Sequence, residues 1–493
     1  MCKPNEIKHV CIVGAGPAGL LAAILLLRRN GNEQQMKYRV TLVDPGTDYG
    51  KLGEDGLHRN RSWMIGLSAH GLSAIRTVPG LYEDYIHGLG VDITCATVGI
   101  SKSLKFTYDA KDFLPEDSSF TVDRNFICAA LSRYLNENFE EDDAFTSHYH
   151  TRALYIDGER RCVVARPTNE EDIRVQYDIL LGCDGVRSIV RNAFVNNHRD
   201  FEFDLKGTFS YSKSVHVPLP DGTKDGNFMF INNALPGWGS FILPETGKML
   251  NVALGTTLDK EPPEELKSDD PKVVSEYFKK HFHAFEIDAD EAGKQWVSQG
   301  WSTNSQVHCN FYHSEKINAL LLGDAAHATS PAIGQGMNTA LADAAALNAI
   351  LDEDKDNWDT VLPKFSAQRV KEGNALTDLS FYTFSLSPVM QLKLMFGQVL
   401  RRKLHVLLPS VFASDPMDEV GRGGKLSEAY HRMSRLGIIQ KVRLVNDSMT
   451  RDHFERKVGM VRDNDKRSFI KTVILYGLPV ACAAVLGMKM GTL

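Results

Sequence analysis

Three short segments rich in glycine and aspartate carry the residue types that bind a nucleotide. They are Gly14-x-Gly16-x-x-Gly19, Asp184-Gly185, and Gly323-Asp324 followed by Gly334-Gln335-Gly336-Met337-Asn338. Glycine lets a backbone approach a phosphate or a flat ring closely because no side chain stands in the way. An aspartate at the end of a strand accepts hydrogen bonds from ribose hydroxyls. These residues therefore predict a dinucleotide site, and no side chain among them is assigned to catalysis.

The first segment has the context that a dinucleotide fingerprint requires. An apolar strand at 10–13 precedes the glycines, a helix at 20–29 follows them, and a second strand at 38–43 ends in Asp44. Asp44 comes 25 residues after Gly19, later than the usual spacing of about 20. The polar stretch 31–37 is predicted to be a loop that absorbs the difference. A chance glycine turn is the alternative interpretation of this segment.

The other two segments also follow predicted strands. The apolar runs 177–183 and 318–322 end just before Asp184 and Gly323, at the carboxyl ends where ligands of open α/β sheets bind. A helix predicted from about Asn338 would direct its free N–H groups and positive dipole end at an anion. By itself, the third segment also fits an ordinary strand–loop–helix crossover.

Several arginines lie near these segments. Arg59 and Arg61 belong to a polar, glycine-rich loop at 51–62 and are candidates for phosphate or flavin contacts; a solvated basic loop fits them equally well. Arg124 follows Asp123, a predicted helix N-cap, and can meet a pyrophosphate or an exposed carboxylate.

Length and composition bound the remaining possibilities. The chain has 493 residues, enough for two or three domains, and a formal charge of −6, which gives no basis for a nucleic-acid partner. Its eight cysteines show no metal-ligand spacing. Buried free thiols in a reducing compartment are therefore expected, in place of disulfides or a metal site.

The pattern along the chain predicts an α/β protein with a discontinuous nucleotide-binding domain. The expected parts are a first segment of the nucleotide-binding domain at 1–205 that includes substrate-region residues near 80–115, an inserted antiparallel substrate sheet at 206–314, a closing segment of the nucleotide-binding domain at 315–360, a helical region at 361–465 and a tail at 466–493. From 358 onward, helices are expected at 358–384, 389–407 and 426–450, with a loop at 409–425. The tail holds 17 apolar, uncharged residues at 472–488 between basic flanks. That length is the low edge of the membrane-spanning range, and a packed C-terminal helix is the alternative.

In this order, the three segments resemble the group A FAD-dependent aromatic monooxygenases. Within that group, further motifs resemble the kynurenine 3-monooxygenases. These motifs are Arg61-Ser62, Gly66-Leu67-Ser68-x-x-Gly71, Gly323-Asp324-Ala325-Ala326-His327-Ala328, Gly334 to Asn338, Phe365-Ser366, Asp378-Leu379-Ser380-x-Tyr382 and Leu408-Pro409-Ser410-x-Phe412. The likeness extends over most of residues 8–415.

The resemblance implies a glutathione-reductase-like FAD-binding Rossmann domain with a substrate sheet packed across it. It assigns FAD contacts to Gly14, Gly16, Gly19, Asp44, Arg61, Arg124, Asp184, Asp324, Gly334, Gly336, Met337 and Asn338, and substrate contacts to Tyr108, Asn338 and Tyr382. NADPH would reduce FAD, and a flavin hydroperoxide formed with O2 would hydroxylate a small aromatic substrate. His327 is expected to be structural. The tail would contact a membrane, the mitochondrial outer membrane by resemblance; otherwise a cytoplasmic protein is expected.

One departure concerns the substrate. The kynurenine enzymes hold the amino-acid carboxylate with an arginine, but residues 90–98 contain none. Loss of such a partner costs a carboxylate substrate about 2–5 kcal/mol unless Lys102 or Lys105 replaces it. The expected activity is hydroxylation of an aromatic other than, or besides, kynurenine. The alternatives are an FAD-dependent epoxidase or reductase of a lipid-like substrate, and a non-catalytic flavin-binding redox sensor or scaffold.

Overall fold

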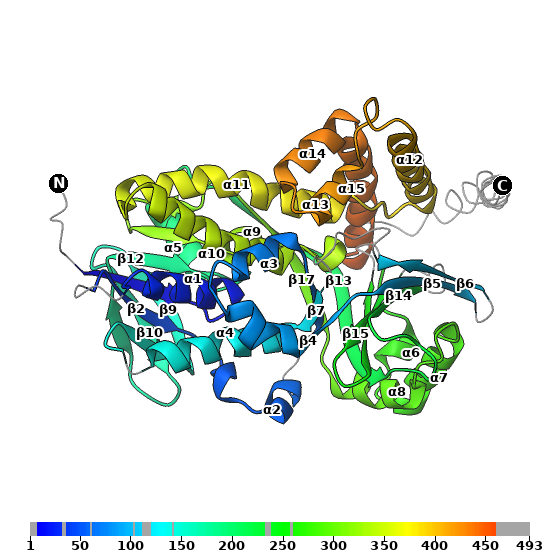
Figure 1. The fold of residues 1–493 in the computed structure, drawn as a ribbon, viewed down its shortest axis with the longest axis horizontal. Coiled ribbons are helices and arrows are strands. Elements are labelled where there is room, and N and C mark those ends of the chain that lie inside the picture. Colours follow the sequence, from blue (N-terminus) through cyan, green and yellow to red (C-terminus); the bar gives the residue numbers. More distant parts are fainter. Residues whose placement is uncertain are drawn as a thin grey trace.

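The computed structural model describes residues 7–31, 36–59, 62–101, 104–110, 120–140, 142–231, 238–256 and 260–459. Figure 1 shows two main bodies, each built around a sheet, with a group of helices above them. The contact through Arg61, the candidate Lys102 and the tail at 466–493 lie outside the described residues, and so do the side chains of Arg59 and Tyr108.

A six-stranded sheet forms the centre of the first body, in the order β18-β19-β12-β1-β2-β8. Its strands are β1 (Lys8–Val13), β2 (Tyr38–Val43), β8 (Phe145–His148), β12 (Ile179–Gly182), β18 (His313–Ser314) and β19 (Ala319–Leu321). All neighbouring strands are parallel except the pair β18–β19. The apolar runs that predicted β1, β2, β12 and β19 are almost entirely buried on both faces, as parallel sheets require.

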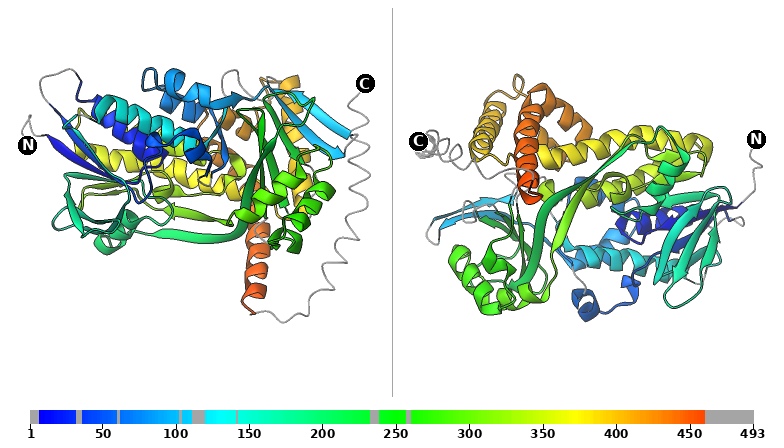
Figure 2. Two further views of the ribbon diagram at one scale, coloured as in Figure 1. Left: turned by 90° about the horizontal axis from the view of Figure 1, so that it is seen from below. Right: turned by 180° about the vertical axis from the view of Figure 1, so that it is seen from behind.

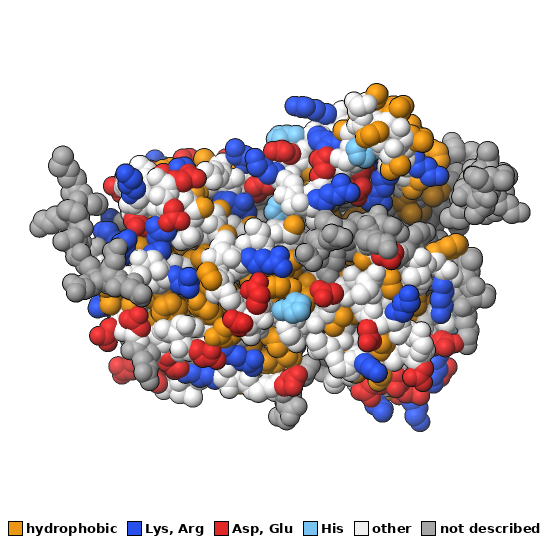
Figure 3. Space-filling view, viewed as in Figure 1, with side chains coloured by type: hydrophobic (Ala, Val, Ile, Leu, Met, Phe, Trp, Pro, Cys, Tyr) orange, Lys and Arg blue, Asp and Glu red, His pale blue; other side chains and the backbone are white. Residues whose placement is uncertain are grey.

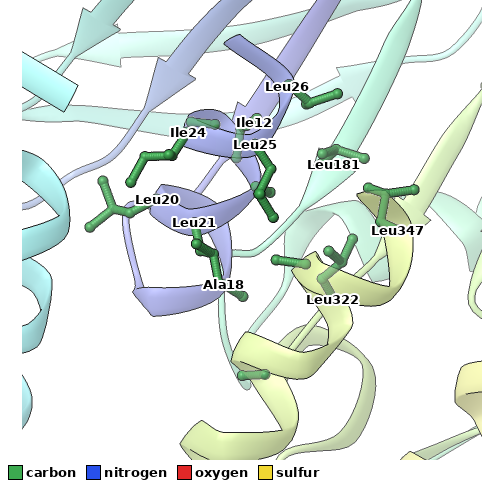
Figure 4. Packing of buried hydrophobic residues seen from close by; sticks show 14 of the residues in the cluster. Ile12, Ala18, Leu20, Leu21, Ile24, Leu25, Leu26, Leu181, Leu322 and Leu347 are labelled. Carbon is green, nitrogen blue, oxygen red and sulfur yellow. The ribbon is translucent and has the colours of Figure 1, made fainter. Parts of the chain in front are cut away.

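Helices cover this sheet and form the main hydrophobic core. Helix α1 (Pro17–Arg28) is buried from Ala18 to Leu27. It packs beside helix α10 (Gly336–Glu353), and Figure 4 shows Ala18, Leu21 and Leu25 directed toward Leu322 and Leu347. Each buried leucine contributes about 1.5–3 kcal/mol to the free energy of unfolding. The same packing fixes where the two helices begin, and both begin at a glycine-rich loop.

A seven-stranded sheet forms the second body, in the order β17-β13-β16-β15-β14-β5-β6. Its strands are β5 (Cys95–Ser101), β6 (Leu104–Asp109), β13 (Phe203–Pro218), β14 (Asn227–Ile231), β15 (Trp238–Glu245), β16 (Met249–Thr256) and β17 (Ser302–Cys309). All pairs are antiparallel except β14–β5. Helices α7 (Pro271–His281) and α8 (Ala289–Ser298) cover one face, as the two views of Figure 2 show.

A smaller sheet joins the two bodies. Strands β3 (Met64–Leu67), β7 (Phe120–Asp123) and β4 (Gly90–Asp92) pair in the order β3-β7-β4. The Thr121 hydroxyl donates a hydrogen bond to the Pro244 carbonyl oxygen at 3.0 Å, which ties β7 to β15 of the seven-stranded sheet. Helix α4 (Arg124–Phe139) begins where β7 ends.

The C-terminal part is helical, with one difference from the sequence prediction. Long helices α11 (Trp358–Tyr382) and α12 (Pro388–Leu407) lie where helices were expected. The single helix predicted at 426–450 is instead two, α14 (Leu426–Arg435) and α15 (Ile438–Lys457). Gly437 separates them with φ +68°, a left-handed conformation that ends a helix. The predicted loop at 409–425 also contains a short helix, α13 (Pro416–Gly421).

Helix α12 presents apolar side chains to solvent. Phe396 is 71% exposed and Val406 is 80% exposed, and Figure 3 shows this concentration of hydrophobic side chains at the upper right. In the described part of the chain, no helix combines the length and apolar character needed to cross a membrane.

The predicted fold class is confirmed: an α/β nucleotide-binding domain, a mostly antiparallel second sheet and a helical C-terminal region. Strands β5 and β6 join the second sheet from the early part of the chain, as expected for residues near 80–115. The domain boundaries stay predictions.

Candidate functional site

The carboxyl edge of the six-stranded sheet brings the predicted nucleotide segments together. Val13 is in register with Val43 on one side and with Gly182 on the other, and Gly182 is in register with Leu321. The loops that leave these strands begin at Gly14, Asp44, Cys183 and Leu322. Segments far apart in the sequence therefore converge at one edge, where open α/β sheets bind ligands.

The three glycines of the turn after β1 have different surroundings. Gly14 has φ +108°, and a side chain there would overlap the Cys183 carbonyl oxygen of the neighbouring loop. A side chain at Gly19 would overlap the Gly14 carbonyl oxygen, so this glycine permits close packing of α1 on the turn. Gly16, by contrast, has open space where its side chain would lie.

The N-terminus of α1 is uncapped and faces this turn. No side chain hydrogen-bonds its first N–H groups, and no acidic residue lies in its first turn. Free N–H groups and the positive end of the helix dipole attract an anion such as a pyrophosphate.

Asp44 lies directly beside the glycine turn. Its carboxylate accepts hydrogen bonds from the backbone N–H of Ala15 at 2.7 Å and of Gly46 at 2.6 Å. These bonds hold the side chain, which is half-buried, at the end of β2. A carboxylate fixed in this way retains lone pairs for ribose hydroxyls.

Asp184 is held by the helix that follows it. Its carboxylate accepts the N–H of Ile189 at 2.7 Å and of Val190 at 3.3 Å, at the start of α5 (Ile189–Asn197). Its second oxygen, Oδ1, is buried without a hydrogen-bond partner among the described residues. Burial raises the pKa of this carboxyl. The unpartnered oxygen can accept a hydrogen bond from a ligand.

A buried arginine locks the Asp184 loop to the Asp324 loop. Arg191 donates to the Val186 carbonyl oxygen at 2.6 Å and to the Ala325 carbonyl oxygen at 2.8 Å. The sequence analysis did not single out Arg191. Its position six residues after Gly185, in the helix that follows the acid-glycine motif, was the available signal.

The buried carboxylate of Asp343 holds the Gly323–His327 turn in place. Asp343 of α10 accepts hydrogen bonds from the Gly323 N–H at 2.9 Å and from Arg369 Nε at 2.6 Å, and pairs with His327 Nε2 at 2.6 Å. His327 and Asp343 are buried, which gives His327 a structural contact. Asp324 itself stays exposed at the first position of the short helix α9 (Asp324–His327). It is available to a ligand at the sheet edge.

Arg124 begins helix α4 close to Asp324. Its guanidinium lies 5.5 Å from the centre of the Trp63 ring and makes no hydrogen bond to a described residue. Burial acts to lower the pKa of Arg124, but the charges of Cys128 and Asp324 outweigh it and raise the pKa. Asp123, the predicted N-cap, accepts the Asn125 N–H at 2.7 Å. Arg124 is thus a fixed cation with free donors.

The loop before α10 is held in shape by its own amides. Gly334 has φ +65°, and Asn338 is fully buried. The Asn338 side chain accepts the Ser68 N–H and donates to the carbonyl oxygens of Gly66 and Gly334, each at 2.9 Å. This geometry gives Asn338 the task of positioning the loop; direct contact with cofactor or substrate stays a prediction. Gly336 and Met337, both half-buried, form the start of α10, which has no side-chain cap.

The two tyrosines predicted to contact a substrate lie in different parts of the fold. Tyr108 belongs to β6 and is in register with Ala96 of β5. Tyr382 ends α11, where its hydroxyl donates to Asp447 at 3.2 Å and the Arg443 guanidinium lies 4.6 Å from its ring centre. Burial raises the pKa of Tyr382.

One face of the seven-stranded sheet is turned toward the nucleotide-binding body. Leu250, Val252 and Leu254 point into the core beneath α7 and α8, so the alternate residues of β16 point the opposite way. On that opposite side, the Ser214 hydroxyl donates to the Ser62 carbonyl oxygen at 3.1 Å. We call this side the inner face.

Aromatic side chains line the inner face. Phe228 and Phe241 stack with ring centres 6.4 Å apart, and Phe241 is 44% exposed. The register Phe228–Ala96 and Ala96–Tyr108 puts the Tyr108 position in the same row. The sequence analysis did not identify the two phenylalanines, although the alternating pattern of these strands was the signal that would have shown them.

The polar end of the inner face carries a buried ion pair. His216 Nδ1 lies 2.8 Å from Glu245 Oε2. Burial lowers the pKa of His216, but the hydrogen bond to Glu245 outweighs it and raises the pKa. Among the described residues, no cluster of His, Cys, Asp and Glu could hold a metal ion.

Comparisons with known proteins point to the same cofactor. A family model described as an FAD binding domain matches residues 87–379. The chain is 25% identical over 453 residues to violacein synthase of Chromobacterium violaceum, covering 87% of this chain and 100% of the relative. It is 25% identical over 415 residues to kynurenine 3-monooxygenase of Sus scrofa, covering 82% of each. The solved structure of a 2-methyl-3-hydroxypyridine-5-carboxylic acid oxygenase mutant shares the fold, with TM-score 0.59, 19% identity and coverage of 76% of this chain and 90% of that one.

Proposed function

Because this chain belongs to the FAD binding domain family and is an FAD-dependent monooxygenase of the group A aromatic hydroxylase kind, we propose that it uses NADPH and O2 to hydroxylate a small aromatic substrate. The observation that carries the proposal is the convergence of the glycine turn, Asp44, Asp184 and Asp324 at one sheet edge, facing an aromatic-lined inner face. The chain spans most of the length of the curated relatives it matches.

The residues at the sheet edge fit FAD. The open space at Gly16 and the uncapped start of α1 suit a pyrophosphate. Asp44 suits the adenosine ribose. The unpartnered Asp184 oxygen, the exposed Asp324 carboxylate and the free donors of Arg124 supply further polar partners for the cofactor. When bound, FAD supplies the electron transfer and oxygen activation that no protein side chain provides.

The protein's own contribution is to position groups and to exclude water. The uncapped N-terminus of α10 directs N–H groups and a positive dipole end at the space above the sheet edge, where they would stabilise negative charge on the reduced ring. The inner face and the end of α11 would shield the reacting atoms, because water in such a site diverts reactive oxygen to hydrogen peroxide.

The structure bears on which substrate fits. Lys105 lies 5.8 Å from the ring centre of Phe285, a residue of the core beneath α7 and α8. It therefore points away from the inner face and does not replace the missing arginine. On β14, β15 and β16, the described inner-face positions hold no lysine or arginine. We infer that the preferred substrate is an aromatic without a free amino-acid carboxylate.

The test uses full-length, detergent-solubilised protein. We expect the visible spectrum of bound flavin, and NADPH oxidation that a neutral aromatic accelerates more than L-kynurenine does. Mass spectrometry of the product should show one added oxygen on the ring. An epoxide or a reduced product would overturn the proposed reaction. Acceleration by kynurenine with formation of 3-hydroxykynurenine would keep the reaction and overturn the substrate inference.

A further inference from the structure

Helix α12 carries a continuous apolar surface that the fold does not bury. Its exposed large side chains recur at spacings of three, four and seven residues, which places them on one face of the helix; they are Met395, Phe396, Val399, Leu400, Val406 and Leu407. Phe396, Val406 and Leu407 are 71%, 80% and 73% exposed. The loop after the helix adds three more exposed apolar side chains, those of Leu408, Val411 and Phe412. We call these side chains together the α12 apolar surface.

The opposite face of α12 is attached to the protein only partly. Together with the start of α15 it lines a groove of about 410 Å³, through Leu394, Gly397 and Arg401 on one side and Ile438 on the other. No residue of α12, which is described over its whole length, is fully buried. The helix lies at the outer side of the helical group in Figure 1 and in the right view of Figure 2. Packing among the described residues therefore does not account for the α12 apolar surface, and an exposed apolar surface of this extent marks a contact with a partner.

The segment that carries the α12 apolar surface is basic. Residues 388–412 contain four lysines and arginines and no aspartate or glutamate. Arg401 and Arg402 are paired with carboxylates from outside this segment. Lys393 and Lys403 are exposed and form no ion pair with a described residue. Two free cations therefore lie on the same helix as the apolar side chains.

This charge decides among the possible occupants of the surface. The tail at 466–493 has four basic residues and no acidic one, so a tail docked on residues 388–412 would bring like charges together. A second copy bound through the same surface would also bring basic segment against basic segment. A bilayer with anionic lipids offers an apolar interior and a negative surface at once. A helix with one apolar face and basic residues beside it lies in the boundary between the two.

We propose that the α12 apolar surface binds a bilayer that contains anionic lipids. The face of α12 that holds Phe396 and Leu407 lies among the acyl chains, with the helix axis along the bilayer. Lys393 and Lys403 extend to the headgroup phosphates, because a lysine places its charge in water while its methylene groups stay in lipid. This site belongs to the folded helical region and is separate from the tail that the sequence predicts to contact a membrane. It does not depend on the reaction proposed above.

The fluorescence of a tryptophan placed on this surface tests the proposal. Full-length, FAD-loaded Phe396→Trp is reconstituted into vesicles of phosphatidylcholine and phosphatidylserine, with or without bromine on the acyl chains. The signal of the natural protein is subtracted, because the chain has five tryptophans of its own. We expect bromine to lower the added fluorescence at least about twofold, as for a side chain inserted among acyl chains. The matched control is Tyr155→Trp in β9 (Thr151–Asp157) of the nucleotide-binding body, where Tyr155 is 51% exposed; bromine should not change its signal.

The same measurement excludes a protein partner. A tail or a second copy seated on the α12 apolar surface would shield position 396 from bromine, and the signal would then match that of the control. Quenching no greater than the control's would therefore overturn the proposal. Quenching should also stay constant as the protein-to-lipid ratio rises, whereas a second copy would displace lipid and reduce it.

Lipid charge and protein charge test the choice of ligand. Each lysine near an anionic surface contributes about fivefold to the affinity, so quenching in Phe396→Trp should fall in vesicles of phosphatidylcholine alone. It should also fall when Lys393→Gln and Lys403→Gln are added, although the tail is unchanged. Lys272→Gln with Lys294→Gln removes two exposed lysines from α7 and α8 and should leave quenching as it was. Equal quenching in neutral vesicles, or in the variant of Lys393 and Lys403, would refute anionic lipid as the ligand.

Hydrogen exchange of the natural protein gives a second measurement that needs no substitution. Vesicles with phosphatidylserine should slow exchange in residues 395–412 relative to vesicles of phosphatidylcholine alone, and should leave exchange in β9 unchanged. Equal exchange in residues 395–412 in the two kinds of vesicle would contradict the proposal. Flavin content and product formation test the proposed function separately, so either proposal can fail while the other stands.

Discussion

At the residue scale, Asp343 holds the Gly323–His327 turn at the carboxyl edge of the six-stranded sheet. It is buried and holds Gly323, His327 and Arg369 together. Burial alone would raise the pKa of its carboxyl, but the charges of His327 and Arg369 outweigh burial and lower the pKa to about 2. In the unfolded chain the same carboxyl titrates near its ordinary value of about 3.9.

The sign of the resulting pH effect follows from this difference. Above about pH 5 both states are ionised and the stabilisation is fully present; as the pH falls toward 2, the unfolded chain takes up the proton first and roughly 2 kcal/mol is lost. Denaturant unfolding of the natural protein and of Asp343→Asn, measured from pH 6 to pH 2.5, should show the difference between them shrinking on acidification. A difference that stays constant across this range would contradict the paired carboxylate.

Asp324 differs from Asp343, because it is exposed and its side chain forms no hydrogen bond or ion pair with another described residue. Asp324→Ala should leave the melting temperature of the flavin-free protein within about 1 °C while removing most of the bound FAD. The measurement is the ratio of flavin to protein absorbance after purification. Asp200→Ala, a change at another exposed aspartate, is the control and should keep full flavin. Full occupancy in Asp324→Ala would refute its place in the cofactor site.

At the element scale, the turn between β1 and α1 separates folding from binding within three residues. Gly14→Ala places a side chain at φ +108° against the Cys183 carbonyl oxygen and should cost at least about 1–3 kcal/mol of unfolding free energy. Gly16→Ala meets only open space in the protein, so it should fold normally and yet lose FAD by blocking the pyrophosphate. Thermal melts paired with flavin content distinguish the two. Normal flavin binding in Gly16→Ala would show that the pyrophosphate does not approach this residue.

The sequence predicted the elements of the nucleotide site because local signals determine them. Tyr38–Val43 was predicted residue for residue as β2, since an apolar run bounded by polar residues leaves little freedom. The break at Gly437 was missed because apolar periodicity continues from α14 to α15, and only the left-handed φ of the glycine reveals the end of the helix. Periodicity reports which face is apolar, and it does not report a change of helix direction.

At the scale of the whole molecule, long-range pairing was the part that local signals could not give. The sequence of residues 95–101 does not indicate that they pair in parallel with 227–231. Parallel strands are not joined by a short turn, so neither strand carries a turn signature that would identify its partner. The inner face, with Phe228 and Phe241, exists only through that assembly. The sequence analysis therefore named the residues of the glycine-rich segments, which local signals mark, and did not name these two phenylalanines.

A shared carboxylate is among the contacts that join the helical region to the second sheet, and this joint should control water exclusion. Asp378 of α11 lies 2.9 Å from Arg443 of α15 and 3.2 Å from His308 of β17. Burial acts to raise the pKa of Asp378, but His308 and Arg443 outweigh it and lower the pKa, so the carboxylate stays charged at neutral pH. Arg443 also lies over the ring of Tyr382, so its loss would loosen both contacts at once.

Arg443→Met should therefore weaken the closure of the helical region without disturbing the nucleotide-binding body. A half-buried carboxylate deprived of one partner costs about 1–3 kcal/mol, and hydrogen exchange should rise in α15 and in the last turns of α11 while β1 and β2 remain protected. With water admitted, a larger share of NADPH oxidation should end in hydrogen peroxide, and a smaller share in hydroxylated product. Arg435→Met changes an exposed arginine at the end of α14 and should leave both measurements unchanged. If Arg443→Met also behaves as the natural protein does, the region does not seal the site, and the shield against water must be sought in the inner face alone.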